Sequence, residues 1–276
     1  DTSTVLAGTL AAFYKQIPLA HLEAVLRSGN IQSPFPEEAN RLLTGHIADY
    51  HFAPTIKAVQ NLAFEGITKN VYLVGNTVID ALYMGLKIIK SAESQKISHF
   101  FSYLDFSKRI ILVTGHRREN FGEGFENICK AIACIANEYK DIQFVYPMHF
   151  NPNVREPVNR ILAGLENIFL LEPLDYPCLI WLMEKCYFVL TDSGGIQEEA
   201  PALGKPVLVM RDVTERQEGV DAGTAMLVGT KTEALVSAMI ELLENNDIYS
   251  MMANTVNPYG DGTTSKQIVN ILRKIL

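Results

Sequence analysis

The sequence predicts an α/β fold with parallel β-sheets, and three observations support this class. From Arg109 onward, short strands alternate with helices at short intervals, as in successive βαβ units. The strands are continuous apolar runs, which are typical of strands covered by helices on both faces. Hydrophobic residues make up 48% and charged residues 20% of the 276 residues, which suits a globular protein and excludes wholesale disorder.

The first part of the chain, residues 1–89, predicts a small α/β domain. Leu6, Leu10 and Phe13 recur at helical spacing and predict a helix over Thr2–Lys15. Further along, the pattern predicts strands at Ile17–Glu23, Tyr50–Ala53 and Val71–Val74 and an amphipathic helix at Glu37–Ala48. The charged residues 90–108 contain no clear strand, and we expect them to link two domains.

Residues 109–262 predict a second, larger domain, and residues 263–276 a C-terminal helix. The predicted strands are Ile110–Val113, Ile142–Tyr146, Ile168–Leu171, Tyr187–Thr191, Pro206–Met210 and Ala225–Val228. The predicted helices are Gly124–Tyr139, Val154–Ala163, Tyr176–Glu184, Ile196–Leu203, Lys231–Glu244 and Thr264–Leu276. In such a sheet, ligands bind beyond the carboxyl ends of the strands, where polar residues and glycines gather in this sequence.

Composition and spacing narrow the classes of function. The formal charge of −7 argues against a nucleic-acid binder, which would need a basic face. No apolar run reaches the ~20 residues that cross a bilayer. The four cysteines are scattered and predict reduced thiols in a cytoplasmic protein. No residue spacing suggests a metal site. The sequence contains neither a Walker loop nor a GxGxxG motif, so nothing in it predicts a bound cofactor.

The turn Asp192-Ser193-Gly194-Gly195 lies between a predicted strand and a helix. Two glycines allow close approach of the backbone to an anion, and the start of the helix offers free N–H groups, which suits a diphosphate. Glu199, further into the same helix, could accept two hydroxyls of a ribose. The alternative is an N-terminal cap and turn with no ligand.

A cationic cluster, His116-Arg117-Arg118, follows the first strand of the larger domain and could neutralise a phosphate leaving group. The alternative is a solvated turn held by Glu119. His149 follows the next strand at the equivalent position, where a structural hydrogen bond is the alternative role.

Three carboxylates of the smaller domain, Asp1, Glu23 and Glu37, are candidates for proton transfer at a sugar. Glu23 ends a predicted strand, and Glu37 follows the stiff turn Ser33–Pro36. The alternative for Glu37 is a carboxylate that stabilises a helix N-terminus.

Taken together, these motifs resemble the non-hydrolysing UDP-N-acetylglucosamine 2-epimerases along the whole chain. The matching segments are Glu23-Ala24, Ser33–Glu38, Gly75–Asp80, Thr114–Glu119, Asn151–Arg155, Thr191–Ala200, Leu203–Met210, Thr214–Arg216 and Asn257–Gly262. The resemblance implies a GT-B-like fold, in which two Rossmann-like domains with parallel sheets flank the substrate cleft. It also implies a homodimer and a cytoplasmic role in cell-surface polysaccharide biosynthesis.

The resemblance implies reversible epimerisation of UDP-GlcNAc to UDP-ManNAc at C2, without a cofactor, through elimination and re-addition of UDP. Its catalytic positions fall on Asp1, Glu23, Glu37 and His116. Its substrate-binding positions fall on Arg117, Leu174, Leu179, Ser193, Gly194, Gly195, Glu199 and Arg216. Among these, the turn of Ser193 and the two glycines matches the phosphate site, Glu199 the ribose ligand, and Leu174 and Leu179 positions near the uracil.

The chain departs from the family pattern in two respects. Val25 stands where the family usually has a glycine, and the family's N-terminal domain begins well before Asp1, so that we expect this domain to be truncated here. We therefore expect the 276-residue chain, as it stands, to be inactive or nearly so. A hydrolysing relative that releases ManNAc and UDP, a glycosyltransferase of the same fold and an inactive nucleotide-binding remnant are the alternatives.

Overall fold

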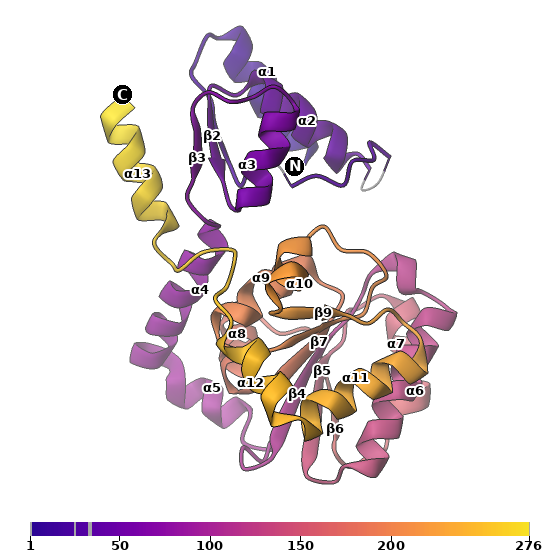
Figure 1. The fold of residues 1–276 in the computed structure, drawn as a ribbon. Coiled ribbons are helices and arrows are strands. Elements are labelled where there is room, and N and C mark those ends of the chain that lie inside the picture. The colour runs from indigo at the N-terminus through magenta and orange to yellow at the C-terminus, as the bar shows by residue number, and fades with distance from the viewer. Residues whose placement is uncertain (1, 25, 33–34, 276) are drawn as a thin grey trace. The chain divides into compact units, whose positions relative to one another are not determined.

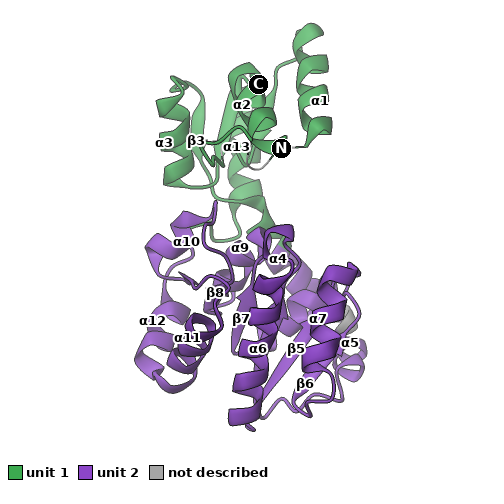
Figure 2. Cartoon of the chain, turned by 90° about the vertical axis from the view of Figure 1, so that its right-hand side faces the viewer, with its two compact units in different colours: residues 1–81, 258–276 green, residues 82–257 purple. Residues whose placement is uncertain are grey.

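The computed structural model describes residues 2–24, 26–32 and 35–275, and these residues form two compact units. Unit 1 consists of residues 1–81 and 258–276, and unit 2 of residues 82–257 (Figure 2). Each unit contains one parallel sheet with helices, as the sequence predicts. Figure 1 shows the order of these elements along the chain. None of the helices described is both long and apolar enough to cross a membrane.

Unit 2 is built on a six-stranded sheet in which every pair of neighbouring strands is parallel. Its strands are β4 (Arg109–Thr114), β5 (Ile142–Pro147), β6 (Ile168–Leu171), β7 (Phe188–Thr191), β8 (Val207–Val209) and β9 (Ala225–Leu227). The spatial order is β6-β5-β4-β7-β8-β9, so that the direction of strand addition reverses between β4 and β7. This reversal is the point at which a doubly wound sheet opens a crevice for ligands.

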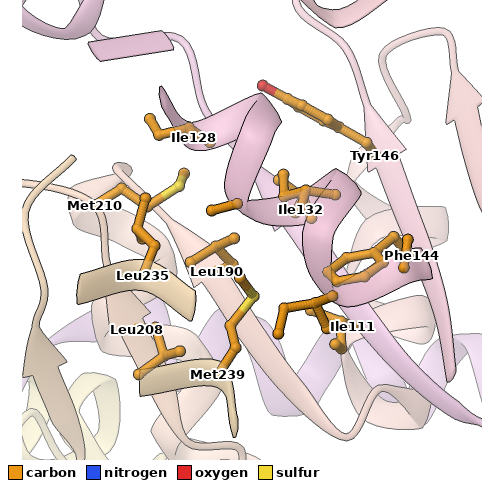
Figure 3. Close-up of a cluster of buried hydrophobic side chains, with 14 of the residues drawn as sticks. Ile111, Ile128, Ile132, Phe144, Tyr146, Leu190, Leu208, Met210, Leu235 and Met239 are labelled. Atoms are coloured by element: carbon orange, nitrogen blue, oxygen red, sulfur yellow. The ribbon is translucent and has the colours of Figure 1, made fainter. Parts of the chain in front are cut away.

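Two hydrophobic cores cover the two faces of this sheet, because alternate residues of each strand point to opposite sides. On one side, Ile111 and Leu190 pack against helices α6 (Glu123–Glu138) and α11 (Thr232–Glu244), as Figure 3 shows. On the other side, Leu112 and Val189 pack against helices α4 (Thr77–Ile88) and α8 (Tyr176–Lys185). Burial on both faces explains why the strands are continuous apolar runs.

The remaining elements of unit 2 are helical. They are η1 (Ile89–Glu93), α5 (Ser94–Phe100), η2 (Arg118–Asn120), α7 (Pro152–Leu162), α9 (Gly194–Ala202), α10 (Gln217–Ala222) and α12 (Asn246–Asn254). The segment expected to be a linker, residues 90–108, is therefore largely helical and continues α4 through η1 into α5. Its Ile97, Phe101 and Leu104 are buried in the core that also contains Leu112 and Val189. The segment therefore belongs to unit 2.

Unit 1 contains a three-stranded parallel sheet in the order β1-β2-β3, formed by β1 (Ala20–Leu22), β2 (Tyr50–Ala53) and β3 (Val71–Leu73). Helices α1 (Ser3–Tyr14), α2 (Glu37–Ile47), α3 (Ile56–Phe64) and α13 (Thr264–Ile275) accompany it. Ala53 packs with α3 on one face, and Phe52 packs with Ile268 of α13 on the other. The alternation along β2 thus produces two small cores.

The C-terminal segment returns to unit 1, so the unit boundary differs from the expected division at residue 262. The carboxylate of Asp80 accepts hydrogen bonds from the backbone N–H groups of Thr264 and Ser265, at 3.1 and 2.8 Å, and so caps α13. The Thr264 hydroxyl donates to the carbonyl of Val74 at 2.9 Å. Gly75 has φ +90°, and a Cβ there would stand 2.6 Å from the Thr264 hydroxyl oxygen, so only glycine permits this contact.

Two histidines lie opposite each other in the unit 1 sheet. His21 of β1 pairs in register with His51 of β2. The Nδ1 atom of each ring is buried without a hydrogen-bond partner among the residues described. Burial, followed by the proximity of His51, lowers the pKa of His21 to about 4. Burial also lowers the pKa of His51. Both imidazoles are therefore neutral in the folded unit near pH 7.

Acid should destabilise unit 1 through His21. The unfolded side chain titrates near 6.5 and the folded one near 4, so the unfolded state binds more protons between these values. Stability is therefore complete above pH 6.5 and falls by about 2–3 kcal/mol as the pH drops toward 4. Hydrogen exchange of β1–β3 peptides at pH 7 and pH 5, corrected for the intrinsic rate, measures this loss.

The His21→Gln variant should lose less protection between the two pH values than the wild type. His46→Gln, at an exposed position of α2, is the matched control and should behave as the wild type. Equal losses in all three proteins would show that His21 does not carry the acid sensitivity.

Candidate functional site

The candidate site of unit 2 lies at the carboxyl ends of β4 and β7, at the reversal point of the sheet. Its centre is Asp192, a completely buried carboxylate. Its two oxygens accept hydrogen bonds from the backbone N–H of His116 at 3.1 and 3.0 Å, and one also accepts from the N–H of Arg117 at 2.8 Å. The side-chain amide of Asn120 donates to the same carboxylate at 3.2 Å and to the carbonyl of Met210 at 3.1 Å. Asp192 therefore joins the loop after β4 to the turn after β7.

His116 stands at the edge of this arrangement with its side chain 46% exposed. Its Nδ1 is 4.0 Å from the Asp192 carboxylate, and its ring stacks on His149 with 5.2 Å between the centroids. Partial burial lowers the pKa of His116, and the Asp192 carboxylate opposes this effect. Burial raises the pKa of Asp192, against the lowering effect of the N–H donors from Arg117 and His116. The imidazole is thus accessible at the edge of the site while Asp192 holds the backbone of His116.

His149 also has a local structural contact. Its Nδ1 accepts a hydrogen bond from the backbone N–H of Asn151 at 3.1 Å. This bond fixes the orientation of the ring through its Nδ1 atom. The expected structural role and a role beside His116 are therefore both compatible with the position of His149.

The turn Ser193-Gly194-Gly195, which we call the anion turn, leads into α9. Ser193 precedes the helix, and its side chain makes no capping hydrogen bond within the described chain. The first N–H groups of α9 therefore lack both an intrahelical partner and a side-chain cap. The Ser193 N–H itself donates to the hydroxyl of Thr191 at 3.0 Å, and that hydroxyl lies 2.6 Å from the hydroxyl of Thr114. The turn is held open at a helix N-terminus, which attracts anions.

The guanidinium of Arg216 lies against this turn. A Cβ at Gly194 would stand 2.8 Å from Cζ of Arg216, so a larger residue there would displace the guanidinium. The Nε of Arg216 donates to Glu198 of α9 at 2.9 Å, and this pair is largely buried. The backbone N–H of Arg216 donates to Thr214, whose hydroxyl donates to Gln197. A fixed cation thus stands beside the free N–H groups, an arrangement that suits a diphosphate.

A second buried cation connects the neighbouring loops. The guanidinium of Arg211 donates to Glu119 at 2.6 Å and to Glu215 at 2.9 Å. Glu119 belongs to the turn η2 that follows His116, and its partner is Arg211 after β8 rather than a cation of its own turn. Arg211 is buried, and a buried charge without a partner would destabilise the fold. The two carboxylates therefore compensate the charge of Arg211.

Glu199 is almost fully buried in α9, and burial raises its pKa. The hydroxyl of Tyr176 donates a hydrogen bond to its Oε1, which opposes that rise. Leu174 lies nearby in sequence and lines a cavity of about 410 Å³ together with Lys96, Phe100 and Cys178. Leu179 is partly buried against the second core.

The candidate residues of unit 1 lie at the carboxyl edge of its own sheet and on α2. Glu23 directly follows β1, is exposed, and has φ +54°. A non-glycine residue in this conformation is held there by its surroundings, which often marks a functional position. Glu37 is the first residue of α2 and is partly buried. Asp1, and Val25 of the Glu-Ala-Val motif, lie outside the described residues.

Sequence reasoning placed Asp192, Asn120 and Arg211 among the polar residues that follow the strands, but it gave no individual role to them and did not single out Tyr176. Asp192 directly follows the buried strand β7, and this position was the available signal. The contacts of the other three depend on residues far away along the chain. Among the described residues, no group of three or more His, Cys, Asp or Glu side chains could hold a metal ion.

Comparison with known proteins gives consistent results. The family model of UDP-N-acetylglucosamine 2-epimerase matches residues 1–273. The chain is 54% identical to a probable UDP-N-acetylglucosamine 2-epimerase of Ralstonia nicotianae and 52% identical to a UDP-N-acetylglucosamine 2-epimerase of Yersinia pestis. These alignments cover 99% of the chain and 74% and 73% of the relatives. The chain is also similar to the crystal structure of UDP-GlcNAc 2-epimerase from Neisseria meningitidis bound to UDP-GlcNAc. The two share 48% of their residues and superpose with a TM-score of 0.93, and the match covers 99% of this chain and 74% of the Neisseria chain.

Replacing Asp192 should destabilise unit 2. In Asp192→Ala, the N–H groups of His116 and Arg117 and the amide of Asn120 lose a charged acceptor in a buried place. We expect a loss of about 2–4 kcal/mol. Urea unfolding followed by the fluorescence of Trp181, the single tryptophan, measures it. Asp247→Ala, at an exposed position of α12, is the control, and a loss below about 0.5 kcal/mol in Asp192→Ala would contradict the role of this carboxylate.

Proposed function

The chain belongs to the UDP-N-acetylglucosamine 2-epimerase family, and from this premise we propose which of its residues bind the nucleotide and which act on the sugar. The reaction is the epimerisation of UDP-GlcNAc at C2, and the fold is GT-B-like. In our proposal, unit 2 binds the UDP moiety, and carboxylates of unit 1 exchange protons with the sugar. Two neighbouring features support this assignment. The turn at the start of α9 lies beside the guanidinium of Arg216, and Asp192 holds the loop that carries His116.

The reaction requires two kinds of groups. A base removes the proton from C2 while the C1–O bond breaks, and the bonding electrons leave with UDP as a C1–C2 double bond forms. Protonation of C2 from the opposite face and return of UDP to C1 complete the epimerisation. Proton removal and return require carboxylates or histidine, and departure of UDP requires cations and N–H donors at the diphosphate.

On the nucleotide side, Ser193, Gly194 and Gly195 bind the diphosphate in our proposal, with Arg216 and Arg117 as cations. The open first turn of α9 and the burial of Arg216 against Gly194 support this. His116 stabilises the departing UDP, since it is exposed and its backbone is held by Asp192.

For the nucleoside, we assign Glu199 to the ribose and Leu174 and Leu179 to the neighbourhood of the uracil. Glu199 is buried, and one of its oxygens has no hydrogen-bond partner in the described part of the chain, so it is available to a ribose hydroxyl. The cavity that Leu174 lines, with Phe100 and Pro173 among its other lining residues, supports a place for a flat ring.

On the sugar side, Glu23, Glu37 and Asp1 are the proposed acid and base groups. The left-handed backbone of Glu23 at the end of β1 and the place of Glu37 at the start of α2 support two of them. For Asp1, family resemblance is the support. By the same resemblance we propose a cytoplasmic homodimer. Sedimentation equilibrium would measure the mass of this assembly.

The proposed reaction predicts deuterium incorporation at C2. The complete gene product, incubated with UDP-GlcNAc in D2O and followed by proton NMR, should yield UDP-ManNAc labelled at C2. His116→Ala should lower turnover more than tenfold, about 1.4 kcal/mol, through loss of diphosphate stabilisation. His99→Ala, at an exposed position of α5, should leave turnover unchanged. Free ManNAc with UDP would favour the hydrolysing alternative, and near-normal turnover in a folded His116→Ala would remove His116 from the mechanism.

Glu199→Ala should weaken UDP binding by about 1.5–3 kcal/mol, the range for a hydrogen bond to a charged group. Isothermal titration calorimetry with UDP measures this directly and does not depend on turnover. Glu138→Ala, at an exposed position of α6, is the matched control. Equal affinities of the two variants would exclude Glu199 from the nucleotide site.

A further inference from the structure

The contact between Tyr176 and Glu199 joins two successive helices, α8 and α9, across the strand β7 that separates them in the sequence. Tyr176 is the first residue of α8, and its hydroxyl donates to Oε1 of Glu199 in α9. The start of α8 is itself fixed, because the Asp175 side chain accepts from the N–H of Cys178 at 3.0 Å and Pro177 restricts the backbone. The hydroxyl is therefore presented from a rigid position.

The surroundings of Glu199 give this hydrogen bond a specific consequence. The carboxylate is only 5% exposed, and burial favours its neutral form. Tyr176 supplies its one hydrogen bond within the described residues, and this bond favours the charged form. The other oxygen, Oε2, lies 3.9 Å from where a Cβ of Gly195 would stand, beside the anion turn. A carboxylate has about four acceptor sites, so Glu199 can accept from Tyr176 and still accept two further hydroxyls.

We propose that Tyr176 is a positioning residue for nucleotide binding, whose hydroxyl keeps the Glu199 carboxylate ionised and directed at the ribose of a nucleoside diphosphate. This inference rests on the proposed function, in which Glu199 binds the ribose. Without the tyrosine hydroxyl, the buried carboxylate takes up a proton at a higher pH and rotates more freely. A protonated Glu199 has fewer acceptor sites for the ribose, so nucleotide affinity would then decrease in mild acid.

The test measures UDP affinity by isothermal titration calorimetry from pH 5.5 to 8 for the wild type and for Tyr176→Phe, which keeps the ring. We expect Tyr176→Phe to bind UDP about fivefold more weakly at pH 7. Its loss of affinity in acid should set in at higher pH than in the wild type. The ionisation of UDP itself is common to both proteins and cancels in the comparison. Tyr249→Phe, whose hydroxyl donates to the carbonyl of Tyr187 at 3.0 Å, is the matched control and should match the wild type.

A double-mutant cycle separates positioning from a general structural effect. In a Glu199→Gln background, the further change Tyr176→Phe should have no effect on UDP affinity or its pH profile. If Tyr176→Phe weakens binding equally in both backgrounds, or leaves affinity and pH profile unchanged while Glu199→Gln weakens binding, this inference is overturned and the proposed function stands. If the wild type does not bind UDP, the proposed nucleotide site falls, and if Glu199→Gln has no effect, Glu199 is excluded from that site; in either case the inference falls with it.

Discussion

The candidate site depends on one buried carboxylate, that of Asp192. At the reversal point of a parallel sheet, the chain segments after β4 and β7 leave the sheet in different directions, and their backbone groups have no ladder partners. Asp192 satisfies the N–H groups of His116 and Arg117 and binds the amide of Asn120. One side chain thereby holds the cationic loop next to the anion turn. The burial of that charge is tolerated because its acceptor sites are filled by donors.

The cations around this centre are held in place by carboxylates. Arg211 is paired with Glu119 and Glu215, and Arg216 with Glu198. Such pairing fixes the direction of each guanidinium, and it also offsets part of the positive charge in the absence of a ligand. The net charge of −7 is therefore compatible with a local site for a diphosphate, because the relevant field comes from a few oriented groups.

The local patterns in the sequence predicted most of the fold. Strands buried on both faces produce continuous apolar runs, and for that reason the six strands of unit 2 were predicted within one or two residues of their observed ends. The helices over 77–100 were not predicted, since the charged residues from Lys90 onward looked like a linker. Its buried Ile97 and Phe101 belong to the core that α8 also covers, and the Phe101 ring stacks on Trp181 of that helix. The boundary between the units was predicted less well, since the C-terminal segment joins unit 1 through Asp80 and Thr264.

The sequence alone predicted the strands of both sheets and most of the helices, the glycine turn at the start of α9, and the motifs that resemble one enzyme family. Periodicity and turn residues act over a few positions, so they can be read locally. Only the tertiary structure decided that Asp192 receives donors from residues 72 to 76 positions earlier, and that Tyr176 meets Glu199. These contacts depend on how the packed sheet brings distant strand ends and helix starts together. The residue types alone do not specify that arrangement.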